Sequence, residues 1–125
     1  MKKRQSLLVF LLALILASSA LAQTFNVDSL QTRLKDARKD AEKLDILSYL
    51  SEAYDNLNSD SSLFFAQMAV ALAKQTNNPG HIASTFYNLG QCYLSSGEYD
   101  KALEVGKKSM AMEEKIGDEV GYAKT

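Results

Sequence analysis

The stretch Gly97-Glu98-Tyr99-Asp100-Lys101-Ala102-Leu103 decides how the chain folds. Glycine readily adopts the left-handed conformation that closes a helix, so Gly97 is expected to end one helix just before the next begins. The helix before it is expected from Phe86-x-x-Leu89-Gly90-x-x-Tyr93, because the apolar residues recur at steps of three and four. Together the two stretches predict a pair of antiparallel helices joined by a short turn.

The same pattern occurs once more, earlier in the chain. Leu47-x-x-Leu50-Ser51-x-x-Tyr54 lies over Phe86-x-x-Leu89-Gly90-x-x-Tyr93 at an offset of 39 residues, and Asp60-x-x-Leu63 lies over Asp100-x-x-Leu103 at an offset of 40. A repeat of this length predicts stacked units, because one unit cannot bury its apolar face alone. We expect repeats at residues 41–78 and 79–117 and the start of a third at residues 118–125, as in a fragment or truncated form of a longer repeat protein.

Turn residues fit this arrangement. Asn58 stands at the place of Gly97 and is expected to close a helix, while Asp60 and Asp118 are expected to cap the helices that follow. Asn78-Pro79 places a capping residue before a proline at the first helical position. The apolar stripes of the second copy are expected at Ile82, Phe86, Leu89 and Tyr93 in one helix and at Leu103, Met110 and Ile116 in the other.

A short capping segment, residues 23–40, is expected before the repeats. Asp28-Ser29-Leu30-Gln31 has the spacing of a capping box that opens a helix. We expect a break near Arg38-Lys39-Asp40, although one helix running to Leu57 also fits, because Ala41 and Leu44 continue the apolar stripe. In either case the segment is expected to cover the exposed end of the first repeat.

Residues 1–22 have the three parts of a secretory signal peptide. Lys2, Lys3 and Arg4 are basic, residues 7–17 form an unbroken apolar run, and Ala20-Leu21-Ala22 precedes Gln23 in the pattern that signal peptidase cuts. A retained membrane anchor is the alternative, but the run is shorter than the roughly 20 apolar residues that a bilayer requires. We therefore expect a periplasmic or secreted protein with no stable membrane contact after cleavage.

These features resemble the tetratricopeptide repeat family, in an extended form of about 40 residues per repeat and of exported bacterial type. The resemblance implies an all-α superhelix of antiparallel helix pairs. This sequence departs from the family pattern at Gly106, where a large side chain is usual, and at Ser62, where alanine is usual; Phe64 and Phe65 are expected to pack on the capping segment. The residues that carry the resemblance, and that are expected to pack the helices, are Leu50, Ser51, Tyr54, Ala69, Phe86, Leu89, Gly90, Tyr93, Gly97, Tyr99, Ala102 and Ser109.

The chain offers little from which an active site could be built. Cys92 is its only cysteine and is expected to be a small buried residue, and His81, its only histidine, is expected to lie in solvent at a helix start. Phosphate loops and nucleophile elbows are absent. Without the three N-terminal cations, 11 basic side chains face 15 acidic ones, a net charge of −4 that argues against a nucleic-acid partner. We expect no enzyme, metal or cofactor.

The resemblance implies that proteins or peptides bind to the face shared by the first helices of successive repeats. The acidic residues expected there indicate a basic or polar partner. The alternative is the extracytoplasmic input region of a receptor, such as a sensor histidine kinase or a membrane-bound transcription regulator; a transmembrane helix beyond Thr125, followed by a kinase or DNA-binding region, would favour it. By resemblance and helical phase the groove residues are Asp45, Ser48, Tyr49, Glu52, Asp55, Asn56, Ser84, Tyr87, Asn88, Gln91, Leu94 and Ser95.

The cleavage site gives a first prediction. Because Ala20-Leu21-Ala22 precedes Gln23, mass spectrometry of the exported product should find Gln23, free or cyclised, as the first residue. A membrane-bound product that retains Met1 would contradict this.

Overall fold

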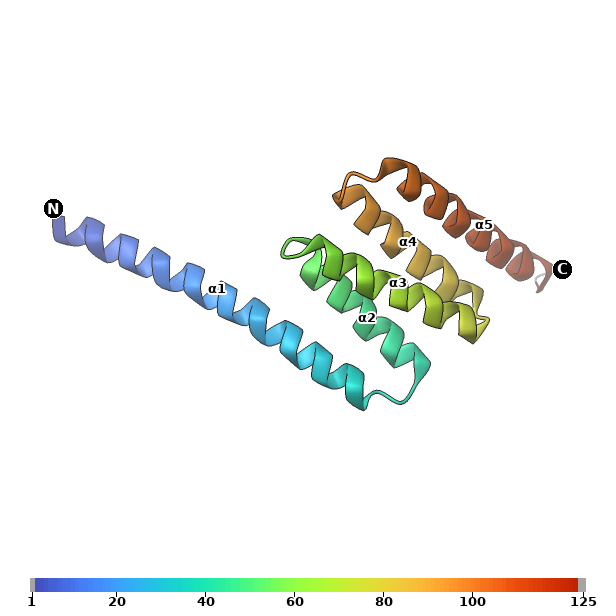
Figure 1. Cartoon of the computed structure of the whole chain (residues 1–125), viewed down its shortest axis with the longest axis horizontal. Helices are drawn as coiled ribbons and strands as arrows, with labels where there is room; N and C mark the ends of the chain where they lie inside the picture. Colours follow the sequence, from blue (N-terminus) through green and yellow to red (C-terminus); the bar gives the residue numbers. More distant parts are fainter. Residues whose placement is uncertain (1, 124–125) are drawn as a thin grey trace.

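The computed structural model describes the backbone of residues 2–123 and the side chains of residues 3–16 and 27–119. The described residues form five helices: α1 (Lys2–Asp36), α2 (Asp40–Asp55), α3 (Ser59–Thr76), α4 (Pro79–Ser95) and α5 (Tyr99–Ala123). Helices α2 to α5 lie side by side as antiparallel neighbours, and the first half of α1 projects away from them (Figure 1). The expected all-α architecture of helix pairs is thereby confirmed.

The segment before the repeats differs from expectation at its start. Helix α1 ends at Asp36 and α2 begins at Asp40, so the expected break is present and a single helix to Leu57 is wrong. No helix starts at Asp28, because α1 is already helical there and the Asp28 carbonyl accepts a bond from Thr32 Oγ1 at 3.0 Å. The physical reason is that residues 2–36 contain no glycine or proline to interrupt the helix.

The end of α1 covers the first repeat, as expected of the capping segment. Val27, Leu30 and Ala37 are buried against Ile46 and Leu50 of α2. The apolar side chains between residues 7 and 16 are instead 48–68% exposed. Within the described part of the chain, no helix combines the length and apolar character needed to cross a bilayer. The expected cleavage site at residues 20–23 lies outside the described side chains.

Asn58 takes a different role from the one expected at its turn. Asn58 has an extended backbone, φ −157°, and its side chain accepts a hydrogen bond from Ser61 N at 3.1 Å. It therefore caps α3 instead of closing α2, and it fills the capping place expected for Asp60. The left-handed residues are Asn77, φ 52°, and Gly97, φ 79°, the latter as expected. The side chain of Asn78 caps α4 ahead of Pro79, also as expected.

Helix α5 is longer than the repeat pattern predicts. It continues through Gly117 and Asp118 to Ala123, so the expected helix break and the expected capping role of Asp118 are wrong. Helix α5 continues past Gly117 because one glycine inside a helix costs only about 1 kcal/mol and no proline follows before Ala123. Residues 124 and 125 lie outside the described residues.

The predicted apolar positions of the second helix are buried or half-buried in the first copy of the pattern, but some are exposed in the second copy. Leu103 and Met110 are 60% and 61% exposed, so the expected buried stripe of α5 is wrong; α5 packs on α4 through Ala102, Val105 and Ser109. Phe65 joins the cluster beneath α1 as expected, whereas Phe64 is exposed. Among the expected packing residues Leu50, Ser51, Ala69, Phe86, Leu89, Gly90, Ala102 and Ser109 are buried, Tyr54 and Tyr93 are half-buried, Gly97 forms a turn, and Tyr99 is 69% exposed.

A buried polar junction joins α2, α3 and α4. Ser51 Oγ donates to the Ser62 carbonyl at 3.0 Å, and Ser62 Oγ donates to the Ser51 carbonyl at 2.8 Å. Cys92 Sγ lies 3.2 Å from Ser51 Oγ. Ser62 was expected to weaken the pattern, because alanine is usual there; it instead replaces an apolar contact with a pair of satisfied hydrogen bonds. Cys92 is buried, as expected.

Gly90 of α4 faces α5 at close range. A Cβ atom added there would lie 3.4 Å from Val105 Cγ2 and 3.8 Å from the Ala102 carbonyl oxygen. This is ordinary contact distance for one methyl group, but there is no room for a longer side chain. Gly106 of α5, in contrast, has nothing within 4 Å of an added Cβ.

Substitution at these two glycines therefore gives opposite results. Gly90→Leu should destabilise the domain by about 1–3 kcal/mol through overpacking, whereas Gly106→Ala should stabilise it by about 0.8–1 kcal/mol because alanine favours helices. Thermal unfolding followed by circular dichroism measures both. An unchanged melting temperature in the Gly90→Leu variant would show that α4 and α5 are not packed in this register.

Candidate peptide-binding face

Helices α2 and α4 are the first helices of the two repeats, and they lie next to each other. Asn88 Nδ2 donates to Ser48 Oγ at 3.1 Å, and Ser95 Oγ donates to Asp55 Oδ2 at 3.3 Å. Both bonds join residues 40 apart, one repeat length, and they connect α2 to α4 at two levels. The pairing holds the outer sides of the two helices in a fixed register and forms a polar surface.

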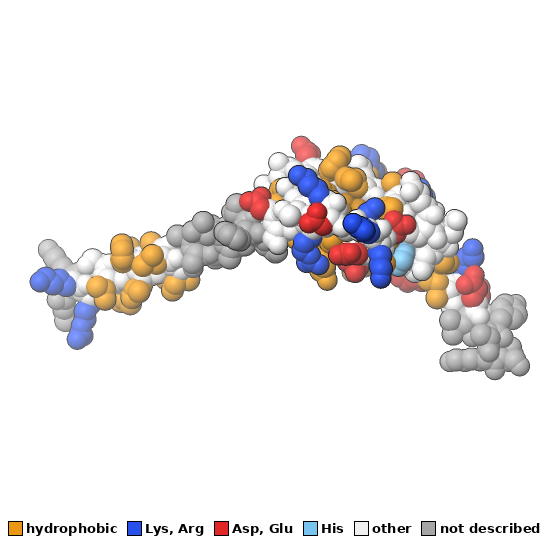
Figure 2. Space-filling view, turned by 90° about the horizontal axis from the view of Figure 1, so that it is seen from below, with side chains coloured by type: hydrophobic (Ala, Val, Ile, Leu, Met, Phe, Trp, Pro, Cys, Tyr) orange, Lys and Arg blue, Asp and Glu red, His pale blue; other side chains and the backbone are white. Residues whose placement is uncertain are grey.

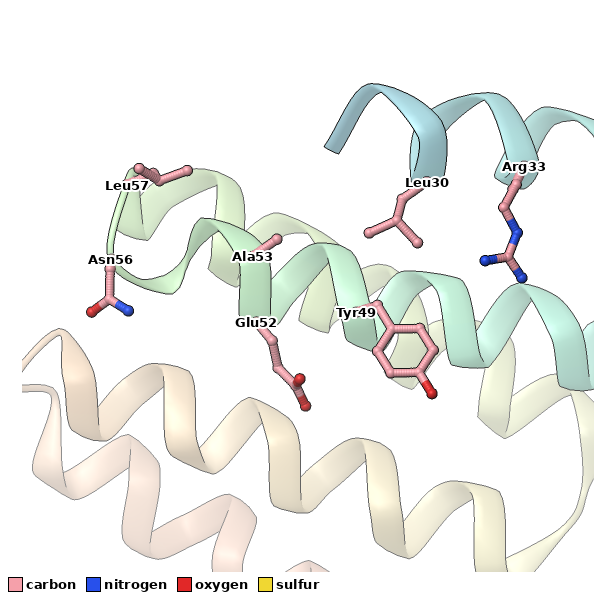
Figure 3. A pocket seen from close by; sticks show the side chains of 7 residues that line it. All are labelled: Leu30, Arg33, Tyr49, Glu52, Ala53, Asn56 and Leu57. Atoms are coloured by element: carbon pink, nitrogen blue, oxygen red, sulfur yellow. The ribbon is translucent and has the colours of Figure 1, made fainter. Parts of the chain in front are cut away.

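Three hollows follow one another across this surface. The first, about 560 Å³, lies between α1 and α2, and Figure 3 shows Leu30 and Arg33 of α1 on one side of it and Tyr49 and Glu52 of α2 on the other. The middle hollow, about 240 Å³, lies between α2 and α4. The end hollow, about 590 Å³, lies between α4 and α5. Glu52 lines both the first and the middle hollow, so these two adjoin.

The middle and end hollows adjoin in the same way, since Tyr87 and Gln91 line both of them. We call this continuous surface the α2/α4 face. It gathers most of the residues that helical phase assigned to a groove. Its predicted members are Tyr49, Glu52 and Asn56 in the first hollow, Glu52, Asp55, Tyr87, Asn88 and Gln91 in the middle hollow, and Tyr87, Gln91 and Leu94 in the end hollow.

The remaining predicted residues stand at the margins of the face. Ser48 and Ser95 make the two bonds between α2 and α4. Ser84 lines a fourth, shallower hollow together with Tyr87 and Asn88. Asp45 is exposed on α2 but lines none of these four hollows.

Charge is distributed unevenly over the face. Helix α2 contributes the carboxylates of Glu52 and Asp55, while α4 contains no Asp, Glu, Lys or Arg. Cations stand only at the two ends among the residues that line the three hollows: Arg33 in the first and Lys107 in the last. The centre of the face is therefore acidic and polar.

Helices α2 and α4 each contribute one exposed tyrosine to this surface. Tyr49 is 54% exposed on α2 and Tyr87 is 57% exposed on α4. Large aromatic side chains that remain exposed on a face with hollows offer contact area to a partner at little cost in ordering. They are the residues from which we expect binding energy.

Several residues of the face were missed by sequence reasoning. Leu30 and Arg33 come from α1, which lies outside the repeats, so no repeat alignment could place them in the first hollow. Tyr99, Leu103 and Met110 were assigned to packing, yet they line the end hollow. Their apolar character and spacing predicted burial, but these three side chains are 60–69% exposed.

The two side chains with shifted pKa values, Glu98 and Lys101, line none of the three hollows. Lys101 Nζ, in the first turn of α5, contacts Oε1 of Glu98, the residue before that helix, at 2.6 Å. Hydrogen bonds from Lys101 and Ser96 hold the pKa of Glu98 below its usual value, and the same contact raises the pKa of Lys101. Both side chains are exposed, so this pair contributes little to stability.

His81 departs from expectation in one respect. It lies in the first turn of α4 as expected, but it is half-buried, and its buried Nδ1 has no hydrogen-bond partner among the described residues. The described residues bring together no group of three His, Cys, Asp or Glu side chains able to hold a metal ion.

Comparison with known families agrees with this geometry. The family model described as the SusR N-terminal TPR domain matches residues 22–110, which is most of the chain. The chain belongs to the SusR N-terminal TPR domain family. TPR stands for the tetratricopeptide repeat, so the resemblance drawn from the packing residues is confirmed. Domains built from these repeats generally bind proteins or peptides.

A curated relative shares part of this TPR domain. Response regulator aspartate phosphatase A of Bacillus subtilis (strain 168) is 40% identical over 60 residues, which cover 47% of this chain and 16% of that protein. The chain therefore spans well under a fifth of that relative's length. No solved structure matches this chain significantly.

Proposed function

We propose that this TPR domain binds an extended peptide segment of another protein along the α2/α4 face. The observation that carries the proposal is the continuity of the three hollows, linked through Glu52 and through Tyr87 and Gln91. An extended chain advances about 3.3 Å per residue, so a series of adjoining hollows suits successive side chains of one strand-like segment. Unpaired backbone groups of that segment would find partners in Asn88, Gln91 and Asn56.

The chemistry of the face favours a basic segment. Glu52 and Asp55 stand at the centre, and no cation lines the middle hollow. A lysine or arginine of the partner would meet two carboxylates there, whereas an acidic segment would meet like charge. Such charges set which partner is accepted and how fast it associates, while Tyr49 and Tyr87 supply the contact area.

Export of the protein is part of the proposal. The apolar stretch in α1 contacts little of the folded domain and projects with its side chains exposed, with basic residues at its tip (Figure 2). An apolar stretch of this length behind a basic start is typical of a removable signal peptide. The family match starting at residue 22 supports a domain that begins where cleavage is expected. The face would then meet partners in the periplasm or outside the cell.

An input region of a receptor is the second candidate. It is favoured by the family description, which names an N-terminal domain and so implies further parts of the protein after it. In that case the peptide or protein bound on the face would be a signal. Both candidates use the same face, so the binding test below applies to both.

Selection from a displayed peptide library tests the binding proposal. Peptides recovered on the wild-type protein should be enriched in lysine and arginine. Tyr87→Ala should lower the affinity for these peptides by about 10-fold or more, as loss of a central aromatic contact does. Glu52→Lys should also lower the affinity for basic peptides, because it replaces a carboxylate of the face with a cation.

The matched control is Phe64→Ala, because Phe64 is as exposed as Tyr87 (57% each) but lies on α3. It should bind peptides like the wild type. All three variants should melt within a few degrees of the wild type. Equal loss of binding in Phe64→Ala and Tyr87→Ala, or selected peptides without basic residues, would count against the proposal.

A further inference from the structure

The first hollow, between α1 and α2, is the part of the α2/α4 face that the repeats do not build alone. Leu30 and Arg33 enter it from α1, which precedes the first repeat. Leu30 is 5% exposed and packs in one cluster with Ile46 and Leu50 of α2. Residues three apart lie on the same side of a helix, so the packing of Leu30 also directs Arg33 toward α2. The cation therefore has a fixed place beside the face.

Four polar side chains of this hollow have bonding capacity that the fold does not use. They are the Arg33 guanidinium, the Tyr49 hydroxyl, the Glu52 carboxylate and the Asn56 amide. None of these groups makes a hydrogen bond or an ion pair within the part of the chain that the structure describes. Arg33 and Glu52 carry opposite charges and line one hollow of about 560 Å³, yet they do not pair with each other. A ligand can therefore engage both charges at once.

Figure 3 shows how these groups are spread along the hollow. Arg33 stands at the end that Tyr49 lines, and Asn56 stands at the opposite end. Glu52 lies between these ends and also lines the middle hollow, which Asp55 lines as well. A chain that crosses α2 along the face therefore meets a cation first and two carboxylates next.

The separation of the cation from the carboxylates sets the spacing of the partner's charges. Across the face, neighbouring helix axes lie about 8–10 Å apart. Along α2, a rise of about 1.5 Å per residue places Glu52 and Asp55 about 4.5 and 9 Å beyond Tyr49. The two offsets together give about 9–13 Å, which an extended chain covers in three or four residues at about 3.1–3.3 Å each.

We propose that the α2/α4 face recognises a segment in which an acidic residue stands three or four positions from a basic one. Arg33 binds the acidic side chain, with the Tyr49 hydroxyl as a second donor, and Glu52 and Asp55 bind the basic side chain. An arginine donates two parallel N–H bonds to a carboxylate, which makes Arg33 selective for an acidic residue at that place. The inference rests on the peptide binding proposed above and adds Arg33 as a residue that determines specificity.

The position of Arg33 also gives it a structural role, which the test must separate from binding. Arg33 stands in the last turn of α1, where a cation stabilises the carbonyl end of a helix. Lys35 stands in the same turn and is exposed, but it lines none of the hollows, because two residues turn a side chain by about 200° round the helix. Lys35 is therefore the matched control for both the helix-end charge and the net charge.

Peptide selection on three forms of the protein tests the inference. The displayed library is selected on the wild type, on Arg33→Glu and on Lys35→Glu. Peptides from the wild type should carry an acidic residue three or four positions from the basic one. Peptides from Arg33→Glu should keep the basic residue but carry lysine or arginine in place of the acidic one, because the reversed charge attracts a cation. Lys35→Glu should return the wild-type pattern.

The affinities of one recovered wild-type peptide give the size of the effect. In fluorescence anisotropy, Arg33→Glu should lower the affinity for this peptide by about 10-fold. Changing the acidic residue of the peptide to lysine should restore binding to Arg33→Glu and weaken binding to the wild type. Tyr87→Ala should lower the affinity for both peptides by the same factor, because Tyr87 does not line the first hollow. Arg33→Glu and Lys35→Glu should both melt within a few degrees of the wild type.

Three results would overturn the inference and leave the proposed function standing. The first is a set of basic peptides without an acidic residue at this spacing. The second is an unchanged affinity in Arg33→Glu. The third is an equal loss in Lys35→Glu, because the charge of the helix end, and not the hollow, would then be responsible. Selected peptides without any basic residue would instead count against both proposals.

Discussion

The packing of α4 on the first repeat is the contact on which the rest of the structure depends. Phe86 and Leu89 meet Ala66 and Val70 on one side, and Val105 of α5 joins the same cluster on the other. A helix pair cannot bury its apolar face alone, so this shared cluster converts two marginal hairpins into one solenoid. It also aligns α2 beside α4, and the α2/α4 face exists only because of that alignment.

Close approach at two points makes this packing possible. Gly90 admits α5, and the paired hydroxyls of Ser51 and Ser62 let α2, α3 and Cys92 of α4 meet without a buried unsatisfied oxygen. The stacking direction gives the molecule two unlike ends. The first end is covered by α1 through Val27 and Leu30, while the last end shows Leu103 and Met110. One side of the solenoid therefore carries the hollows of the α2/α4 face, and its last end leaves apolar side chains exposed.

The sequence predicted features that depend on neighbours within one repeat. The helix pairs, the turn at Gly97 and the buried positions of Leu50, Phe86 and Gly90 all follow from local spacing, and they are found as expected. Features that depend on an outside neighbour were not predictable. Phe86 and Leu103 have equally good apolar spacing, yet one is buried and the other exposed, because only the first has a helix packed over it. The role of Asn58 depended on whether it closes α2 or caps α3, which local spacing does not decide.

The groove residues were predicted on a different basis from the core. Helical phase correctly grouped Glu52, Tyr87 and Gln91 on one face, but it could not include Arg33, which reaches the face from α1. Nuclear magnetic resonance mapping with a bound basic peptide tests the central claim most directly. The account predicts amide shifts concentrated around Tyr49, Glu52, Tyr87 and Gln91. Shifts concentrated instead on the outer side of α3, around Phe64 and Met68, would contradict it.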